Sequence, residues 1–379
     1  MQTLSVAQGT FTLARYPENK RDSLRAWDAA DEYLLHHLST EGLPTTGCRT
    51  LILNDAWGTL STALANAAPW TLSDSFLSHK GTEVNLVRNG RASAAVRLLS
   101  SLDRPDDSID LLLFKVPKSL ALLEDELYRL RPLLHAQTHI VGAGMVRDVH
   151  TSTLDLCKRL IGPTHTSLAQ KKARLIFSTL DTNLEVGLSP YPTAYALQGT
   201  EFTLENAANV FSRQRLDNGT RLLLRHIPSL SGTVQIADLG CGNGVIGLVA
   251  AERSPQAELL FVDESFMAVS SARANFQRAF RGRIASFIAG DGLVECDPDS
   301  LDLVLCNPPF HRQQAIDQTV PWRMFAQAKR ALKTGGQLLV VGNSGLRHHG
   351  RIKRIFGHCS TLEQTGKFVV LSAQKSAVR

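Results

Sequence analysis

Short apolar segments alternate with helix-length amphipathic segments along the whole sequence, and this pattern occurs twice. The second half contains "VQIADLG", "AELLFVDES", "SLDLVLCNPPF" and "GQLLVVGNS", and the first half contains "RTLILND" and "SIDLLLFKVP" at corresponding places. Strands that alternate with helices predict βα units and a mostly parallel sheet. The short connection between "TLEQ" and "KFVVLSAQ" predicts a hairpin, so the last strands are expected to be antiparallel. We therefore expect an α/β fold with two similar domains.

Two of these segments resemble each other in a way that indicates a duplicated domain. "SIDLLLFKVP" and "SLDLVLCNPP" share a serine, an aspartate, several leucines and a final proline, although two apolar strands can also be similar by chance. Where the second copy has Asn-Pro-Pro-Phe (307–310), the first has Lys-Val-Pro-Lys (115–118), and the first keeps only Gly58 of the glycine-rich loop. With the linker that follows the first copy, this predicts domains at 1–189 and 190–379, of which the first is degenerate.

Length and composition exclude several classes of protein. A chain of 379 residues exceeds one ordinary domain, and 43% hydrophobic with 20% charged residues is typical of a soluble globular protein. No apolar run is long enough to cross a bilayer and the first residues lack a secretory pattern, so we expect a cytoplasmic protein without a membrane role. The six cysteines include no Cys-x-x-Cys pair and are expected to be free thiols.

The sequence predicts an anionic partner and no metal site. His135 and His139 have the spacing of one helical face, but no glutamate lies between them and no third ligand is evident. The net charge of +6 favours a partner that carries negative charge. The densest basic stretches near the second copy's strands are "RHHGRIKR" (347–354) and "SARANFQRAFRGR" (271–283), although such a stretch can equally be an ordinary solvated surface.

The second half carries a glycine-rich loop between a strand and a helix. "ADLGCGNG" places Asp238, Gly240 and Gly242 at this junction, where glycines permit positive φ and let the backbone approach a ligand. Asp263 closes the next strand, where a carboxylate can bind ribose hydroxyls, and Asp291 follows the third strand. Each acid alone could be a helix cap. Together they bring three carboxylates to the sheet edge where open α/β folds bind ligands.

This set of residues resembles the S-adenosylmethionine site of class I methyltransferases. The resemblance implies that Asp238, Gly240 and Gly242 hold the methionine part of the cofactor, Asp263 the ribose and Asp291 the adenine region. It also implies two tandem class I (Rossmann-like) methyltransferase domains, of which only the second keeps a cofactor site.

The strand predicted at the start of "LDLVLCNPPFHR" (301–312) ends in an amide, two prolines and an aromatic residue. An exocyclic amino group on a base is a poor nucleophile because its lone pair is delocalised into the ring. If Asn307 Oδ1 and the Pro308 carbonyl accept its two hydrogens, the lone pair turns towards the methyl group, and Phe310 can stack on the base. A proline that merely ends the strand is the alternative. Because the segment resembles the (Asn or Asp)-Pro-Pro-(Phe or Tyr) motif of methyltransferases that modify planar nitrogen, Asn307, Pro308 and Phe310 are the predicted catalytic residues.

Further segments resemble the RsmC/RlmG group of bacterial ribosomal RNA guanine-N2 methyltransferases over nearly the whole chain. They are "NVFSRQRLDNGTRLLLRHIP" (209–228), "RIKRIFGHCSTLEQT" and the closing "GKFVVLSAQK". The resemblance is greatest to the large-subunit branch, and it implies methyl transfer from S-adenosylmethionine to the exocyclic N2 of a guanine in 23S rRNA. It also implies that Phe211, Asp217 and Gly219 line the pocket and that the N-terminal domain lacks a cofactor site.

The motifs leave the acceptor open. The same chemistry could act on a guanine of 16S rRNA, on adenine N6 or on a protein glutamine, and a non-catalytic RNA-binding assembly factor is a further alternative. The first domain is expected to hold RNA, because Lys115 and Lys118 stand where the second copy has its catalytic motif. Arg347 and Arg351 are further expected RNA contacts, and the protein is expected to act as a monomer without a metal ion.

Overall fold

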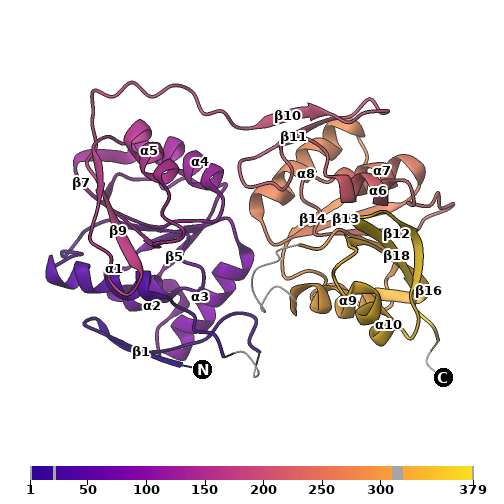
Figure 1. Ribbon diagram of the computed structural model, residues 1–379, viewed down its shortest axis with the longest axis horizontal. Coiled ribbons are helices and arrows are strands. Elements are labelled where there is room, and N and C mark those ends of the chain that lie inside the picture. Colours follow the sequence, from indigo (N-terminus) through magenta and orange to yellow (C-terminus); the bar gives the residue numbers. More distant parts are fainter. Residues whose placement is uncertain (1, 20–22, 310–318, 378–379) are drawn as a thin grey trace. The chain divides into compact units, whose positions relative to one another are not determined.

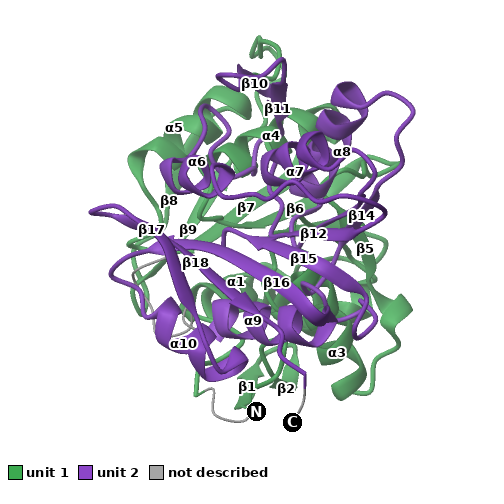
Figure 2. Cartoon of the chain, turned by 90° about the vertical axis from the view of Figure 1, so that its right-hand side faces the viewer, with its two compact units in different colours: residues 1–191 green, residues 192–379 purple. Residues whose placement is uncertain are grey.

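The computed structural model describes the chain apart from residues 1, 20–22, 310–318 and 378–379 (Figure 1). The chain divides into two compact units, unit 1 (Met1–Tyr191) and unit 2 (Pro192–Arg379), which Figure 2 colours separately. Each unit has its own sheet and its own hydrophobic core. The predicted catalytic residue Phe310 lies outside the described residues.

The described part of unit 1 is built on a seven-stranded sheet with the strand order β5-β4-β3-β6-β7-β9-β8. The strands are β3 (Thr50–Leu53), β4 (Trp70–Ser73), β5 (Arg97–Ser100), β6 (Ile109–Lys115), β7 (Leu134–Met145), β8 (Thr164–Thr166) and β9 (Ala173–Ser178). Strand β9 is antiparallel to β7 and β8, and the other neighbours are parallel. A separate hairpin and the helices are β1 (Gln2–Val6), β2 (Gly9–Leu13), α1 (Ala29–Thr40), α2 (Thr59–Ala63), α3 (Phe76–Arg88), α4 (Leu120–Leu130), α5 (Thr151–Leu160) and 3-10 turns at Ala65–Ala67, Ser93–Ala95 and Arg131–Leu133.

The described part of unit 2 has a sheet with the order β14-β13-β12-β15-β16-β18-β17. The strands are β12 (Gln235–Leu239), β13 (Glu258–Asp263), β14 (Ser286–Ala289), β15 (Leu301–Cys306), β16 (Leu332–Asn343), β17 (Ser360–Gln364) and β18 (Phe368–Gln374). As expected from the sequence, β18 is antiparallel to its neighbours β16 and β17. A hairpin and the helices are β10 (Thr193–Ala196), β11 (Thr203–Asn206), α6 (Asn218–Leu224), α7 (Val245–Arg253), α8 (Phe266–Ala279), α9 (Thr319–Ala331) and α10 (His348–Phe356).

Side chains of β15 alternate between two helical layers, as expected for a strand covered on both faces. Leu303 and Leu305 pack with residues of α6, α7 and α8 in one core, and Val304 and Cys306 pack with residues of α9 and α10 in the other. Figure 1 shows these two groups of helices on opposite sides of the sheet. Because β15 is buried on both faces up to Cys306, the residue that follows it, Asn307, is held at a fixed place at the carboxyl edge.

The two sheets have the same strand order, which confirms the predicted internal repeat. The agreement extends to an asparagine at the same position of α3 and α8. Asn85 Nδ2 donates to the carbonyls of Ala14 and Trp57 at 2.9 and 2.8 Å, and Asn85 Oδ1 accepts Ala14 N at 3.0 Å. Asn275 makes the same bonds to Glu205 and to the glycine-rich loop. Each amide thus connects the end of the first hairpin of its unit to the loop before the preceding helix, α2 in unit 1 and α7 in unit 2.

The structure places His135 and His139, whose spacing would suit one helical face, on a strand. They lie on β7, and residues four apart in a strand are separated by about 13 Å. Their imidazoles therefore cannot share a metal ion.

The six cysteines are free thiols, as predicted. Among the described residues, no helix is both long enough and apolar enough to cross a membrane.

Candidate active site

Strands β12 and β15 are parallel neighbours in unit 2, and Leu239 pairs with Cys306. The glycine-rich loop and Asn307 follow directly from these two residues. A Cβ atom built on Gly240 would lie 3.9 Å from the backbone oxygen of Asn307. The predicted cofactor loop and the predicted catalytic amide therefore lie side by side at the carboxyl edge of the sheet, where open α/β folds bind ligands.

The loop requires glycine for two different reasons. Gly240 and Gly242 have φ values of 75° and 53°, in the left-handed region that side chains disfavour. At Gly244, a Cβ would approach Ala272 Cβ to 2.9 Å, so glycine is needed there for close packing of α7 on α8. No described atom lies within 4 Å of the Cβ position of Gly242. A ligand can therefore approach the backbone at Gly242.

Asp238 is fully buried near the end of β12. Its Oδ2 accepts Gly247 N at 2.8 Å, whereas its Oδ1 has no hydrogen-bond partner in the part of the chain that the structure describes. Burial, with a contribution from the charge of Asp263, raises the pKa of Asp238 to about 8. A buried acceptor without a partner is unfavourable. The geometry fits a cofactor that brings an ammonium group or another donor to this oxygen.

Asp263 ends β13 and Asp291 follows β14, at the same edge of the sheet. Asp263 Oδ2 accepts Gly242 N at 2.9 Å and its Oδ1 accepts Ser265 N at 3.0 Å, so this carboxylate holds both the loop and the start of α8. Asp291 forms an ion pair with Arg323 of α9, and burial raises the pKa of Asp291. The structure thus brings the three predicted acids to one edge, where they also serve the fold.

Asn307 is held by a residue that the sequence analysis missed. Its Nδ2 donates to Thr220 Oγ1 at 2.8 Å, and its Oδ1 is buried without a partner among the described residues. Thr220 lies in the first turn of α6, where the N-cap residue Asp217 accepts Thr220 N at 3.0 Å. The available signal was Asp217 alone, because aspartate is a residue type favoured at helix N-caps.

The remaining residues predicted to line the pocket differ in how exposed they are to solvent. Gly219 is buried in α6, where a Cβ would come within 3.0 Å of the Phe368 ring. Phe211 is 60% exposed in the segment between β11 and α6. Pro308 is buried directly after Asn307.

In unit 1, the corresponding loop after β3 is closed by its own side chains. It begins with Asn54 at φ 61° and keeps a glycine only at Gly58, at φ 74°, before α2. Asp55 is buried, and its carboxylate accepts the backbone N–H groups of Thr59 and Ser61 at 3.0 and 2.8 Å. The carboxylate of Asp55 therefore accepts hydrogen bonds from backbone N–H groups at the start of α2, which are then not available to a ligand.

Lys115, which the sequence predicts to contact RNA, is engaged inside unit 1 instead of being exposed to solvent. Its Nζ lies 2.7 Å from Asp31 Oδ1 and 2.8 Å from Asp28 Oδ1, and its side chain is only 14% exposed. Burial lowers the pKa of Lys115, but the two carboxylates outweigh burial, and the pKa is raised. The ammonium group is thus part of an internal ion-pair cluster.

The other predicted RNA contacts lie nearer the surface. Lys118 and Arg347 are exposed, and Arg351 is half-buried on α10. The side of α10 that packs on the core carries His348, Ile352 and Phe356. Two further basic residues of this helix are exposed, Lys353 and Arg354. The structure therefore leaves a basic surface on α10.

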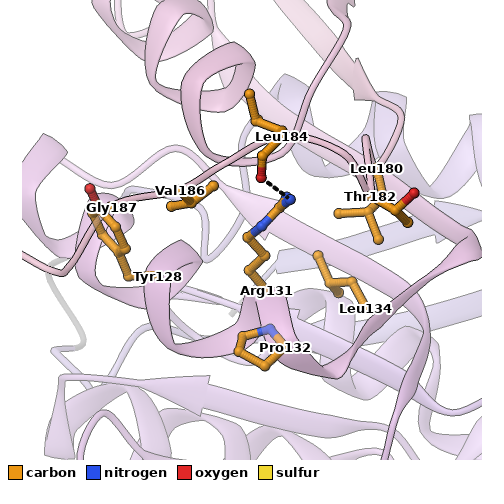
Figure 3. A pocket seen from close by; sticks show the side chains of 9 residues that line it. All are labelled: Tyr128, Arg131, Pro132, Leu134, Leu180, Thr182, Leu184, Val186 and Gly187. Carbon is orange, nitrogen blue, oxygen red and sulfur yellow. Dashed lines mark hydrogen bonds between the residues drawn. The ribbon is translucent and has the colours of Figure 1, made fainter.

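A hollow of about 510 Å³ lies in unit 1 (Figure 3). Arg131 donates across it to the carbonyls of Leu184 and Asp181, at 2.9 and 2.8 Å. The residues that line it are Tyr128, Arg131, Pro132, Leu134, Leu180, Thr182, Leu184, Val186 and Gly187. None of the predicted cofactor or catalytic residues is among them, so this hollow is distinct from the candidate active site.

Solved structures include one with the same fold over both units. The 16S rRNA N2 methyltransferase RsmC of T. thermophilus, in complex with AdoMet and guanosine, has a TM-score of 0.76 and 22% sequence identity. The likeness covers 99% of this chain and 97% of that chain. It confirms the predicted architecture of two class I methyltransferase domains.

Sequence comparisons identify the family. Residues 1–182 match the RLMG N-terminal domain, and residues 201–372 match the methyltransferase small domain. Ribosomal RNA large subunit methyltransferase G of Streptomyces griseus is 52% identical, over 99% of this chain and 100% of that protein. The protein of the same name from Pseudomonas aeruginosa is 48% identical, over 96% of this chain and 97% of that protein. The chain therefore belongs to the family of ribosomal RNA large subunit methyltransferase G.

Proposed function

We propose that the chain transfers a methyl group from S-adenosylmethionine to the exocyclic N2 of a guanine in 23S rRNA. Relatives in the family are named methyltransferases of large-subunit ribosomal RNA. The observation that carries the proposal is Asn307 Oδ1, a buried oxygen that has no partner among the described residues. The backbone of the same residue lies beside the glycine-rich loop. An amino group on a base is a donor that would complete this oxygen's hydrogen bonding.

The cofactor supplies a methyl group on a positively charged sulfur when it is bound. Asn307 Oδ1 accepts one hydrogen of the guanine amino group, and the Pro308 carbonyl accepts the other, which turns the nitrogen lone pair towards the methyl group. The nitrogen–carbon bond forms as the sulfur–carbon bond breaks, and the amino group then releases one proton to solvent. Proline restricts φ, which holds the accepting carbonyl in place.

Three acids would hold the cofactor in the proposed complex. Asp238 Oδ1 accepts from the ammonium group of the methionine part, next to Gly240 and Gly242. Asp263 accepts from the ribose hydroxyls, as acids at the end of the second strand do in related folds. Asp291 lies in the adenine region, where it shares its carboxylate with Arg323.

Helix α10 is the proposed RNA contact in unit 2, through Arg347 and Arg351. Two arginines of the other basic stretch, 271–283, are engaged within the unit. Arg283 donates to three backbone carbonyls at 2.5 to 3.1 Å, and Arg278 pairs with Glu205. Cations that already serve the fold contribute little to phosphate binding, whereas an exposed cation such as Arg347 releases counterions when it binds RNA.

Unit 1 is the proposed RNA-holding domain, with the boundary to the catalytic domain at 189/190. The exposed Lys118 is the remaining proposed contact there.

Two fused homologous domains can replace the two copies of a dimer, so we propose that the protein acts as a monomer. We further propose that it acts in the cytoplasm, where rRNA is made in bacteria, and without a metal ion.

Mass spectrometry of rRNA nucleosides tests the proposal. Cells that lack the protein should lose N2-methylguanosine at one position of 23S rRNA, and the intact chain should restore it, whereas Asn307→Ala should not. An unchanged 23S profile would refute the proposed acceptor. Loss from 16S rRNA, loss of N6-methyladenosine or loss of a methylated glutamine would assign another acceptor, and restored ribosome assembly by Asn307→Ala would favour a non-catalytic factor.

A further inference from the structure

One side chain of α6 contacts the Asn307 amide. Asn307 Nδ2 donates to Thr220 Oγ1 at 2.8 Å, and in this orientation Oδ1 is the atom left without a partner in the described part of the chain. Thr220 is itself buried and is fixed by the N-cap bond from its backbone N–H to Asp217. The hydroxyl that meets the amide is therefore held by both the helix start and the surrounding core.

The proposed reaction depends on which end of the amide faces the acceptor. An amide oxygen can accept a hydrogen from the guanine amino group, but an amide nitrogen has only hydrogens to offer. If the amide turned by half a rotation, donor would face donor and the amino group would lose the contact that turns its lone pair. In the productive orientation, the hydroxyl of Thr220 accepts from Nδ2. This bond and the proposed bond from the guanine amino group to Oδ1 support each other.

Unit 1 has a contact at the position that corresponds to the Asn307–Thr220 contact, but it is an ion pair. There, Lys115 at the end of β6 pairs with Asp31, which lies in the first turn of α1. Asp31 N donates to the N-cap residue Asp28 at 3.3 Å, just as Thr220 N donates to its own N-cap residue. In both units, the third residue after a helix N-cap therefore holds the polar residue at the end of the central strand.

We propose that Thr220 is a positioning residue, which fixes the Asn307 amide so that Oδ1 faces the acceptor amino group. This inference rests on the proposed function and adds a residue to it. Thr220 acts through Asn307 and does not touch the acceptor. Its removal therefore slows methyl transfer without weakening cofactor binding.

Single substitutions in the full chain test this role, with 23S rRNA from cells that lack the protein as substrate. Thr220→Val keeps the shape and removes the hydroxyl, and it should lower kcat by about 10-fold to 100-fold, as misplaced catalytic groups commonly do. The Kd for S-adenosylmethionine should stay within a few-fold of the parent. Thr220→Ser keeps the hydroxyl and should retain most of the parent kcat. Thr82→Val, which removes a buried hydroxyl that bonds Ser78 O in unit 1, is the matched control and should leave kcat unchanged.

A double-substitution cycle separates positioning from a general structural effect. In the Asn307→Ala background, Thr220→Val should cause no further loss of single-turnover rate, because the amide it positions is gone. A further loss as large as in the parent would overturn the inference, and so would a parent-like kcat for Thr220→Val. If Thr220→Val does not fold, Thr220→Ala removes the same hydroxyl and takes its place in the cycle. A parent chain that methylates no rRNA would instead refute the proposed function.

Discussion

Lys115 Nζ lies 2.7 Å from Asp31 Oδ1 in unit 1, at the place where Asn307 contacts Thr220 in unit 2. The two copies thus keep one arrangement of strand end and helix start and use it differently. In unit 2 it leaves an acceptor oxygen unpaired among the described residues. In unit 1 it forms a closed ion-pair cluster, which fits the proposal that only unit 2 carries an active site.

Replacement of Lys115 by methionine should destabilise the fold rather than weaken RNA binding. The substitution removes the cation between Asp28 and Asp31, and breaking a buried ion pair from one side typically costs on the order of 3 kcal/mol. Urea unfolding of the full chain measures the loss. Lys118→Met, at an exposed position, should leave the free energy of unfolding nearly unchanged. A Lys115→Met chain as stable as the parent would contradict the structural role of the cluster.

Replacement of Asn307 by alanine should abolish most turnover and leave cofactor affinity intact. Its Oδ1 is assigned to the acceptor amino group, and loss of one well-placed polar group in such a site lowers kcat by about 100-fold to 1000-fold. Methyl transfer to 23S rRNA gives the rate, and calorimetry gives the Kd for S-adenosylmethionine. Turnover within a few-fold of the parent would remove Asn307 from the mechanism.

Locally encoded features could be predicted from the sequence, whereas contacts between distant segments could not. The glycine-rich loop, the three acids and the Asn-Pro-Pro-Phe motif are each written within a few residues of a strand end, and strand order then brings them together. The contacts of Asn307 with Thr220 and of Lys115 with Asp28 each join residues 87 positions apart. For this reason the sequence missed Thr220 and gave Lys115 a solvent-exposed role that its ion pairs exclude.

The full chain should bind one S-adenosylmethionine, in unit 2. Asp263→Ala should weaken binding by about 10-fold to 100-fold, since it removes a charged acceptor that also holds Gly242 N. Ser73, which ends β4 in unit 1 as Asp263 ends β13 in unit 2, offers the matched control. Calorimetry of Ser73→Ala should match the parent. A stoichiometry of two, or weaker binding by Ser73→Ala, would place a cofactor in unit 1.

Binding of S-adenosylmethionine should release a proton from Asp238. Because burial raises the pKa of this carboxyl to about 8, it is mostly protonated at pH 7 in the free chain. A cationic cofactor stabilises the ionised form, so the pKa falls on binding, and the proton is released. Calorimetry at pH 7 in buffers of different ionisation enthalpy measures this release, which should approach one proton for the parent and none for Asp238→Asn. Equal release by both proteins would assign the proton to another group.

The chain should lose stability in acid because of His348. This residue is buried in unit 2 with its ring 5.6 Å from that of Phe325, and neither ring nitrogen has a hydrogen-bond partner among the described residues. Burial, with a contribution from the charge of Arg351, lowers the pKa of His348 to about 4 from its ordinary value of 6.5. The folded state therefore resists protonation, and the stability that neutral His348 contributes is lost as the pH falls from 6.5 towards 4.

Urea unfolding at pH 7 and pH 5 measures this effect. The linkage relation predicts a loss of roughly 2 kcal/mol between these two pH values from His348 alone. His348→Leu keeps a neutral side chain at this position and should show a drop that is smaller by that amount. His349→Leu, at the exposed neighbouring position of α10, should keep the parent's dependence. If His348→Leu and the parent lose the same stability between pH 7 and pH 5, His348 is not the group that makes the fold sensitive to acid.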